Sequence, residues 1–306
     1  MNTFYIQISL FLLCISLYLN NKTLATDRAP GKDATPELTD HCLISEEIYE
    51  KNKHLLCTNP EEIVEASELM KEAVAQFNYF TTSKDDYKFC RSCYLCHPFF
   101  CEKKHQDYTY VKKNEYTIDD PDMYNEIIKM LWDPEYANLI NKGSIIRKIT
   151  RVYNKNLVMI QQRYKDSSSD NWKYFYALAT IADVSEGTTV IVIVSADIND
   201  HNSKDKRSYR NKVIEKANLF KTDIDSENDI RKGKLKKTFV NIAGYHVEKK
   251  NNYVNFTYID SVSDIQILIT QSFISTIVKK YIVDCYASSY LKQIIRKALW
   301  CFFPHK

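Results

Sequence analysis

The sequence predicts an α/β protein of the α+β kind, in which a curved antiparallel sheet is closed by a long C-terminal helix. Three observations lead to this prediction. Short runs of β-branched and aromatic residues, separated by turn residues, fill the middle of the chain. Amphipathic helical patterns precede and follow these runs. The connections between the runs are too short for parallel crossovers, so the strands are expected to be antiparallel.

The first 25 residues have the features of a secretory signal peptide. An almost uncharged apolar run from Ile6 to Leu19 precedes polar residues and a small-residue cleavage site after Ala25. The run is shorter than the about 20 residues that a membrane-spanning helix needs, and a retained anchor is the alternative. Residues 26–58 are expected to form a flexible leader with a short helix, and residues 59–306 the main domain.

The main domain is expected to begin with a helix. Asn59 can cap it, Pro60 suits its first position, and apolar residues follow at helical spacing. Residues 87–118 predict two or three strands. The pattern of residues 124–132 predicts a short helix that stops at Asp133-Pro134.

Six further strands and a terminal helix complete the predicted order of elements. The strands are expected over Ile145–Tyr153, Leu157–Tyr164, Trp172–Ala182, Thr188–Ala196, Thr238–Glu248 and Tyr253–Val262. The highly charged segment His201–Lys237 is the expected insertion or mobile edge. The terminal helix, from about Ile267 to Trp300, carries a broad apolar stripe.

Composition and motifs exclude several classes of function. The chain has 44% hydrophobic and 26% charged residues, which is typical of a globular protein with a real core. A net charge of +3 with both signs alternating gives no support for nucleic-acid binding. The sequence has no phosphate-binding glycine loop, serine nucleophile elbow or His-Glu-x-x-His motif. We therefore expect a non-enzyme without a cofactor, and we separately expect a monomer.

Cysteines form the one cluster with the spacing of metal ligands. Cys90, Cys93, Cys96 and Cys101 could hold zinc or an iron–sulfur centre. An even number of cysteines remains after Cys14 leaves with the signal peptide, and secretion favours disulfides over metal. We predict no metal, while disulfides and free buried thiols both stay open for these residues.

Two sets of residues resemble known families. The segment from Pro121 to Tyr136, with Leu131-Trp-Asp-Pro134, resembles the short helix of START (StAR-related lipid transfer) domains. The wider chain is similar to the fam-a (PYST-A) group of exported malaria-parasite proteins. That similarity lies in Asn20-Asn-Lys-Thr-Leu-Ala25, Glu46-Glu-Ile-Tyr-Glu-Lys-Asn-Lys-His-Leu-Leu-Cys57, Arg151-Val-Tyr-Asn154, Asn156-Leu-Val-Met-Ile-Gln-Gln-Arg-Tyr164 and Lys234-Leu-Lys-Lys237.

The resemblance implies a helix-grip START-like fold around a lipid-sized apolar cavity. It further implies binding of a phospholipid, with phosphatidylcholine as one candidate, and its transfer through transient contact with a membrane surface. Secretion would be followed by export to the parasitophorous vacuole or the host erythrocyte. The alternative is an exported surface antigen or interaction protein that uses the same fold without a ligand, its apolar residues filling a solid core.

Candidate site residues follow from the same resemblance. Choline-lipid carriers of this family are expected to place an arginine and a carboxylate where this chain has Ala137 and Asn141. The lipid-contacting candidates are therefore Trp132, Tyr136, Arg151, Gln161, Arg163, Phe273, Ile277 and Tyr281. Alternation places Gln161 and Arg163 on one face of a strand, and whether that face is the inner or the outer one stays open.

The end of the terminal helix is the candidate for membrane contact. Its basic and aromatic side chains suit the head-group region of a bilayer, and an ordinary solvated helix end is the alternative. The candidate residues are Lys292, Arg296, Lys297 and Trp300.

Overall fold

The computed structural model describes residues 40–83, 87–92, 99–105, 109–140, 145–165, 171–205 and 209–262. The chain divides into the units Met1–Leu38 and Thr39–Lys306, and all described residues belong to the second. The expected signal peptide and terminal helix lie outside the described residues. The same holds for the candidates Phe273, Ile277, Tyr281, Lys292, Arg296, Lys297 and Trp300.

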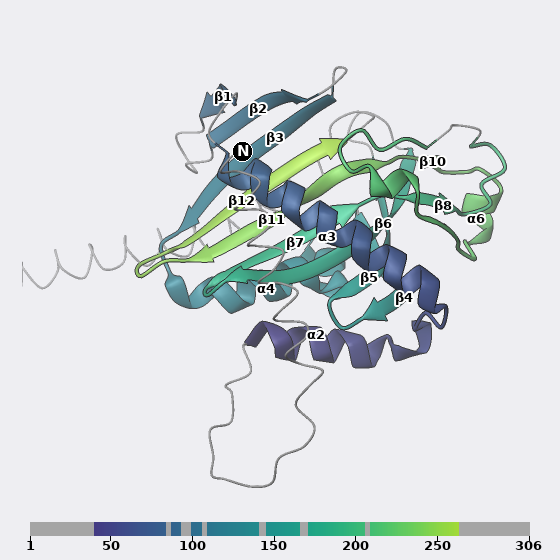
Figure 1. Ribbon diagram of the computed structural model, residues 1–306, viewed down its shortest axis with the longest axis horizontal. Helices are drawn as coiled ribbons and strands as arrows, with labels where there is room; N and C mark the ends of the chain where they lie inside the picture. Colours follow the sequence, from purple (N-terminus) through teal and green to yellow (C-terminus); the bar gives the residue numbers. More distant parts are fainter. Residues whose placement is uncertain are drawn as a thin grey trace, which may run out of the picture. The chain divides into compact units, whose positions relative to one another are not determined.

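A ten-stranded sheet forms the centre of the second unit (Figure 1). Its main path runs β1-β2-β3-β12-β11-β7-β6-β5-β4 with antiparallel neighbours, and β10 pairs with β6 in parallel. The strands are β1 Lys88–Ser92, β2 Phe99–His105, β3 Thr109–Ile118, β4 Ile145–Asn154, β5 Leu157–Lys165, β6 Trp172–Ser185, β7 Thr188–Val194, β10 Lys236–Lys237, β11 Val240–Lys249 and β12 Val254–Val262. The path ends at β1 and β4, so the sheet is open. The predicted α/β class with a large antiparallel sheet is confirmed.

Helices cover both faces of the sheet (Figure 1). Helix α3 packs on one face, and α2 and α4 pack on the other; we call these the α3 face and the α4 face. The helices are α2 Asp40–Lys51, η1 Lys53–Leu55, α3 Pro60–Thr82, η2 Pro121–Met123, α4 Tyr124–Trp132, α5 Pro134–Ile140, η3 Lys216–Asn218 and α6 Asn228–Arg231. Helix α2, expected within a flexible leader, contributes the buried Ile48 to the core of the α4 face.

Local sequence explains where the helices begin. The Asn59 side chain accepts hydrogen bonds from the backbone N–H groups of Glu61 and Glu62, so the predicted start of α3 is confirmed. The sequence did not predict α5. The Asp133 side chain accepts a hydrogen bond from the Glu135 N–H at 2.9 Å, and Pro134 occupies the first helical position, so a new helix starts where α4 ends.

The sheet is apolar on both faces because both are covered. In β7 every residue is buried, and in β5 six successive residues are buried. The α3 face packs against α3 residues such as Phe77 and Phe80. The α4 face packs against Ile127, Ile128 and Leu131 of α4. Two separate apolar layers therefore lie one on each side of the sheet.

The charged segment 201–237 packs against the sheet over its described residues, and its expected mobility stays a prediction. Its apolar residues Ile214, Phe220 and Ile230 are buried against the α3 face. Strand β9 (Lys221–Asp223) lies in this segment. It pairs in parallel with β8 (Asp197–Asn199), which precedes the segment, to form a separate two-stranded sheet. An ion pair of 3.0 Å between Lys237 and Asp200, both buried, adds a polar anchor.

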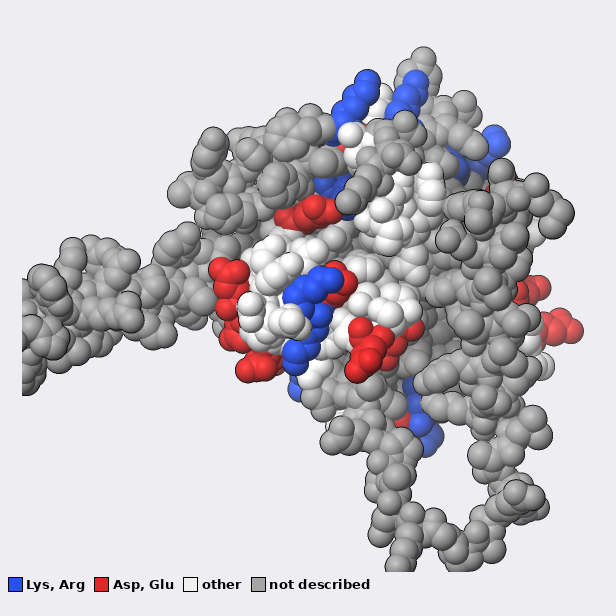
Figure 2. Space-filling model, turned by 60° about the vertical axis from the view of Figure 1, so that its left-hand side comes forward, with Lys and Arg blue, Asp and Glu red and all other residues white. Residues whose placement is uncertain are grey.

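The described surface carries charges of both signs. Figure 2 shows Lys and Arg side chains next to Asp and Glu on the face that it presents, without a field of one sign. Within the described ranges, no helix has the length and apolar character needed to span a bilayer.

Candidate functional site

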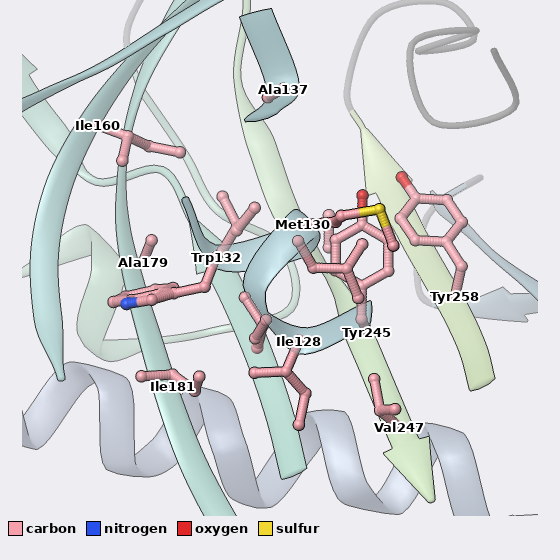
Figure 3. Close-up of a cluster of buried hydrophobic side chains, with 14 of the residues drawn as sticks. Ile128, Met130, Trp132, Ala137, Ile160, Ala179, Ile181, Tyr245, Val247 and Tyr258 are labelled. Carbon is pink, nitrogen blue, oxygen red and sulfur yellow. The ribbon is translucent and has the colours of Figure 1, made fainter. Parts of the chain in front are cut away.

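A small apolar pocket lies between the sheet and the corner where α4 meets α5. Its walls come from the end of α4, the start of α5 and four strands: Leu131, Trp132, Pro134, Arg147, Ile149, Val158, Ile160, Ala179, Ile191 and Ile193. The free space is about 10 Å³, which holds about one water molecule. Figure 3 shows the side chains that fill this region. The α4 face is therefore packed over its described residues, whereas the resemblance implied a cavity of lipid size.

Among the described residues, Arg147 is the only charged one that lines the pocket. Its Nε donates to Gln162 Oε1 at 2.8 Å, its Nη1 donates to the Leu131 carbonyl at 3.3 Å, and it forms a hydrogen bond with the Tyr245 hydroxyl. All three partners are neutral, and no carboxylate among the described residues pairs with this guanidinium. Burial lowers the pKa of Arg147. A cation without a counter-charge in an apolar site is costly, which marks it as a functional candidate.

The register of β4 and β5 sets the direction of Arg147. Arg147 lies directly opposite Gln162, whose side chain is buried on the α4 face. A bulge then adds one residue to β4 between Ile149 and Arg151. Arg147 and Arg151 are four residues apart and would share a face in a regular strand. The bulge turns Arg151 to the α3 face and leaves Arg147 in the pocket.

Trp132 offers a second hydrogen-bond donor to the pocket. Its side chain is only 5% exposed, and its indole Nε1 has no hydrogen-bond partner among the described residues. A buried indole N–H usually has an acceptor. In Figure 3 the ring lies between Ala179 and Ile181, on the sheet side of α4. The pocket thus presents a guanidinium and an unused N–H, both of which suit an anionic or acceptor group.

Two tyrosines and a carboxyl extend the site along β11 and β12. Tyr245 and Tyr258 lie opposite each other, with ring centroids 5.2 Å apart. Burial raises the pKa of Tyr245 to about 12, although Arg147 opposes the shift. Asp260 follows Tyr258 by two residues on the same face and is 8% exposed. Burial raises the pKa of Asp260 to about 7; Lys112 acts against this shift. The α4 face therefore carries a buried basic and a buried acidic group that both act on the pKa of Tyr245.

The structure separates the residues that the sequence proposed as lipid contacts. Trp132 lines the pocket, and Tyr136 is half-buried on α5, where its hydroxyl lies 3.5 Å from Glu126 Oε1. Arg151 lies on the α3 face and forms an ion pair with Glu62 of α3 at 2.6 Å. Arg151 does not line the pocket, and the proposed contact of Arg151 with lipid stays a prediction.

Gln161 and Arg163 also lie on the α3 face, on one side of β5 as alternation predicted. They line an outer cleft of about 450 Å³ together with Ile146, Lys148, Glu227, Asn228 and Asp229. Arg163 pairs with Asp229 at 2.6 Å and with Glu227 at 3.0 Å. Burial favours a higher pKa for Glu227, but hydrogen bonds from Lys148 and Gln161 outweigh it and lower that pKa to about 2. These charges neutralise one another and fasten α6 to the sheet.

The predicted cysteine cluster receives no test from the structure. Cys93 and Cys96 lie outside the described residues, and the side chains of Cys90 and Cys101 are also not described. Among the described residues, no group of three or more His, Cys, Asp or Glu side chains is arranged to hold a metal ion. Cys57 has a free thiol.

Comparison with known proteins finds likeness in structure but not in sequence. No protein-family model and no curated protein sequence matches the chain. Human StAR-related lipid transfer protein 5 is similar at a TM-score of 0.49 and 8% identity, over 71% of this chain and 93% of that one. Human STARD10 is similar at a TM-score of 0.43 and 12% identity, over 74% of this chain and 80% of that one. The lipid transfer and protein localization domain of human StarD13 is similar at a TM-score of 0.37 and 13% identity, over 68% of this chain and 87% of that one.

Proposed function

We propose that this chain is a non-enzymatic lipid-binding protein that holds a phospholipid on the α4 face, with the phosphate against Arg147 and the Trp132 indole N–H. It would act as a monomer and carry the lipid between membranes through transient contact with their surfaces. Secretion, with export to the parasitophorous vacuole or the host erythrocyte, belongs to the proposal through the sequence resemblance alone.

The single observation that carries the proposal is the charge of Arg147 in an apolar pocket with neutral partners. Guanidinium has five N–H donors in a planar fork that matches phosphate oxygens. Gln162, Leu131 and Tyr245 are its three acceptors, so donor capacity remains. A phosphate would supply the missing counter-charge, and the indole N–H of Trp132 would gain an acceptor.

The apolar walls of the pocket suit acyl chains, but only after a rearrangement. The free space of about 10 Å³ is far below the ~300 Å³ at which ligand sites usually begin. Leu131, Trp132 and Pro134 form the wall on the helix side. The end of α4, with Leu131 and Trp132, would therefore move away from the sheet when a lipid enters.

The acidic group beyond Tyr245 favours a zwitterionic head group such as phosphocholine. A quaternary ammonium interacts favourably with aromatic rings and with a carboxylate. Tyr245, Tyr258 and Asp260 offer both on the same face as Arg147. This arrangement supports phosphatidylcholine as one candidate ligand within the proposal.

A second candidate function is that of a surface antigen or interaction protein without a ligand. The observation in its favour is the tight packing of the α4 face, because a solid core needs no lipid to fill it. The two candidates differ in whether the purified protein carries lipid and in whether Arg147 has a purpose beyond its internal hydrogen bonds.

Native mass spectrometry of the purified full chain, followed by phospholipid transfer between vesicles, tests the proposal. We expect co-purifying or added phospholipid to bind, and Arg147→Gln to weaken that binding by about tenfold or more, since a hydrogen bond to a charged group contributes about 1.5–3 kcal/mol. Lys148→Gln is the matched control: it also replaces a cation of β4 by glutamine, but on the α3 face.

The outcomes separate the two candidates. A protein that binds no phospholipid under any condition overturns lipid binding and supports the ligand-free function. A protein that binds phospholipid equally well with Arg147→Gln overturns the assignment of the site while leaving lipid binding in place.

A further inference from the structure

Strand β4 lies at the edge of the sheet, and its outer backbone groups need partners. An edge strand exposes a row of N–H and C=O groups that water, side chains or another strand must satisfy. Near the C-terminal end of β4, the segment that follows η1 provides a partner: the Cys57 N–H donates to the Val152 carbonyl at 2.7 Å. At Arg147 the contact comes from a side chain instead.

The Asn138 amide on α5 pairs with both backbone groups of Arg147. Its Nδ2 donates to the Arg147 carbonyl at 2.9 Å, and its Oδ1 accepts from the Arg147 N–H at 2.6 Å. A carboxamide has a donor and an acceptor side by side, so it can replace the peptide group of a neighbouring strand. Asn138 thus fixes the backbone of the one residue whose side chain brings a charge into the pocket.

The side chain of Arg147 is held at the same corner. Its Nη1 donates to the Leu131 carbonyl near the end of α4, while Nε donates to Gln162 across the strand pair. Helix α5 begins two residues after Trp132. The α4–α5 corner therefore fixes Arg147 twice, at the backbone through Asn138 and at the guanidinium through Leu131. Ala137, the neighbour of Asn138, is buried in the α4-face core and anchors this part of α5.

We infer that Asn138 is the positioning residue for Arg147: its amide holds the edge strand at the rotation that directs the guanidinium into the pocket. The inference rests on the proposed function, in which Arg147 binds the phosphate. Without the amide, the edge backbone at Arg147 loses two hydrogen bonds and can turn toward water. A displacement of about 1 Å at a recognition group is enough to weaken recognition strongly. Asn138 would then affect head-group recognition without touching the ligand.

The experiment compares two soluble short-chain lipids with identical acyl chains, a phosphatidic acid and a diacylglycerol, which differ only in the phosphate. The quantity measured is the ratio of their affinities for the full chain, together with the melting temperature. We expect Asn138→Ala to lower this ratio by about tenfold, the equivalent of one or two hydrogen bonds. Leu139→Ala, on the next residue of α5 and 76% exposed, is the matched control and should leave the ratio unchanged.

A double-mutant cycle distinguishes positioning from general destabilisation. In an Arg147→Gln background, Asn138→Ala should lower the ratio no further, because the group through which Asn138 acts is already absent. Asn138→Asp keeps the acceptor for the Arg147 N–H and loses the donor. It should reduce the ratio in the same direction, and it provides the test if the alanine variant does not fold.

Each outcome has one meaning. Equal loss of both lipids in the Asn138 variants, or an additive effect in the cycle, overturns the positioning role and leaves Asn138 a purely structural residue. If Arg147→Gln itself leaves the ratio unchanged, the phosphate site of the proposed function fails, and the positioning role fails with it. A lowered ratio that Arg147→Gln abolishes supports both.

Discussion

Asp260 should make the stability of this protein depend on pH in a direction opposite to that of most carboxylates. Its side chain is 8% exposed, and burial raises its pKa to about 7, while Lys112 offsets part of the shift. In the unfolded chain the pKa of an aspartate is about 4. The folded state therefore binds the proton more tightly than the unfolded state. The stabilisation is complete below about pH 4 and is lost as the pH rises through about 7.

The magnitude follows from proton linkage. One proton taken up only by the folded state changes the free energy of unfolding by at most about 1.4 kcal/mol per pH unit. Between pH 8 and pH 5 the Asp260 carboxyl becomes almost fully protonated in the folded protein and stays ionised when unfolded. The chain should therefore gain about 2 kcal/mol of stability from this group over that interval. Asp260→Asn, which mimics the neutral carboxyl, should remove the gain.

Urea unfolding of the full chain at pH 5, 6, 7 and 8 measures this effect. The relevant quantity is the difference in the free energy of unfolding between the wild type and Asp260→Asn, because other groups titrate in both proteins. His246 is one of these: burial lowers its pKa, so its contribution is lost as the pH falls and opposes that of Asp260. Asp119→Asn, at an exposed carboxylate, controls for the substitution itself. A difference that stays constant from pH 5 to pH 8 would refute the reasoning.

Three further substitutions test the packing and the pocket. Gly244→Ala should destabilise the fold by about 2 kcal/mol or more, measured by thermal unfolding, because an added Cβ would meet the Ile191 carbonyl and the Phe77 ring; an unchanged melting temperature would contradict this close approach. Trp132→Phe should change stability by less than about 1.5 kcal/mol, since the lost N–H has no partner, yet weaken phosphatidic acid binding more than diacylglycerol binding; equal weakening would exclude the indole from phosphate recognition. Ala137→Arg should destabilise by about 1–3 kcal/mol because the site is 2% exposed and apolar; a stable variant with altered head-group preference would instead support the choline-carrier alignment.

Much of the fold could be predicted because local patterns determine it. The Asn59-Pro60 start of α3 and the strands of β-branched and aromatic residues rest on short-range chemistry that tertiary packing did not override. The corner after α4 was only half predicted. Asp133-Pro134 ends one helix, as expected, but the same two residues also provide the cap and the first position of α5.

The site could not be predicted, because alternation assigns residues to a shared face without saying which face is inner. Gln161 and Arg163 do share a face, but it is the α3 face. Where both faces of a strand are buried, as in β5, hydrophobicity does not distinguish them. The bulge at Thr150 added a second difficulty, since it puts Arg147 and Arg151 on opposite faces despite their even spacing. The one sequence feature that pointed to the site was Gln162, a polar residue within the apolar run of β5.

The segment 201–237 shows why charge density alone does not indicate unpaired, solvated charges. Its carboxylates meet cations that come from the sheet, as in the pairs Arg163–Asp229 and Lys148–Glu227. The partners are more than sixty residues apart in sequence, so no local pattern reveals that the charges are paired. With its charges neutralised, the segment can bury Phe220 and Ile230 against the α3 face.

The contacts of Arg147 link recognition to opening in the proposed carrier. Its guanidinium donates to the Leu131 carbonyl, at the end of α4 where the helix dipole is negative. A phosphate with full negative charge would compete for the same donor, because it offers a counter-charge and two oxygens in the planar geometry of the guanidinium fork, whereas the carbonyl offers a single neutral acceptor. Binding would therefore remove a bond that holds the end of α4 to the sheet, while the Asn138 side chain on α5 keeps strand β4 in place. Arg147 would then have two roles. It would recognise the head group, and it would release the end of α4, which forms the wall that the acyl chains must pass.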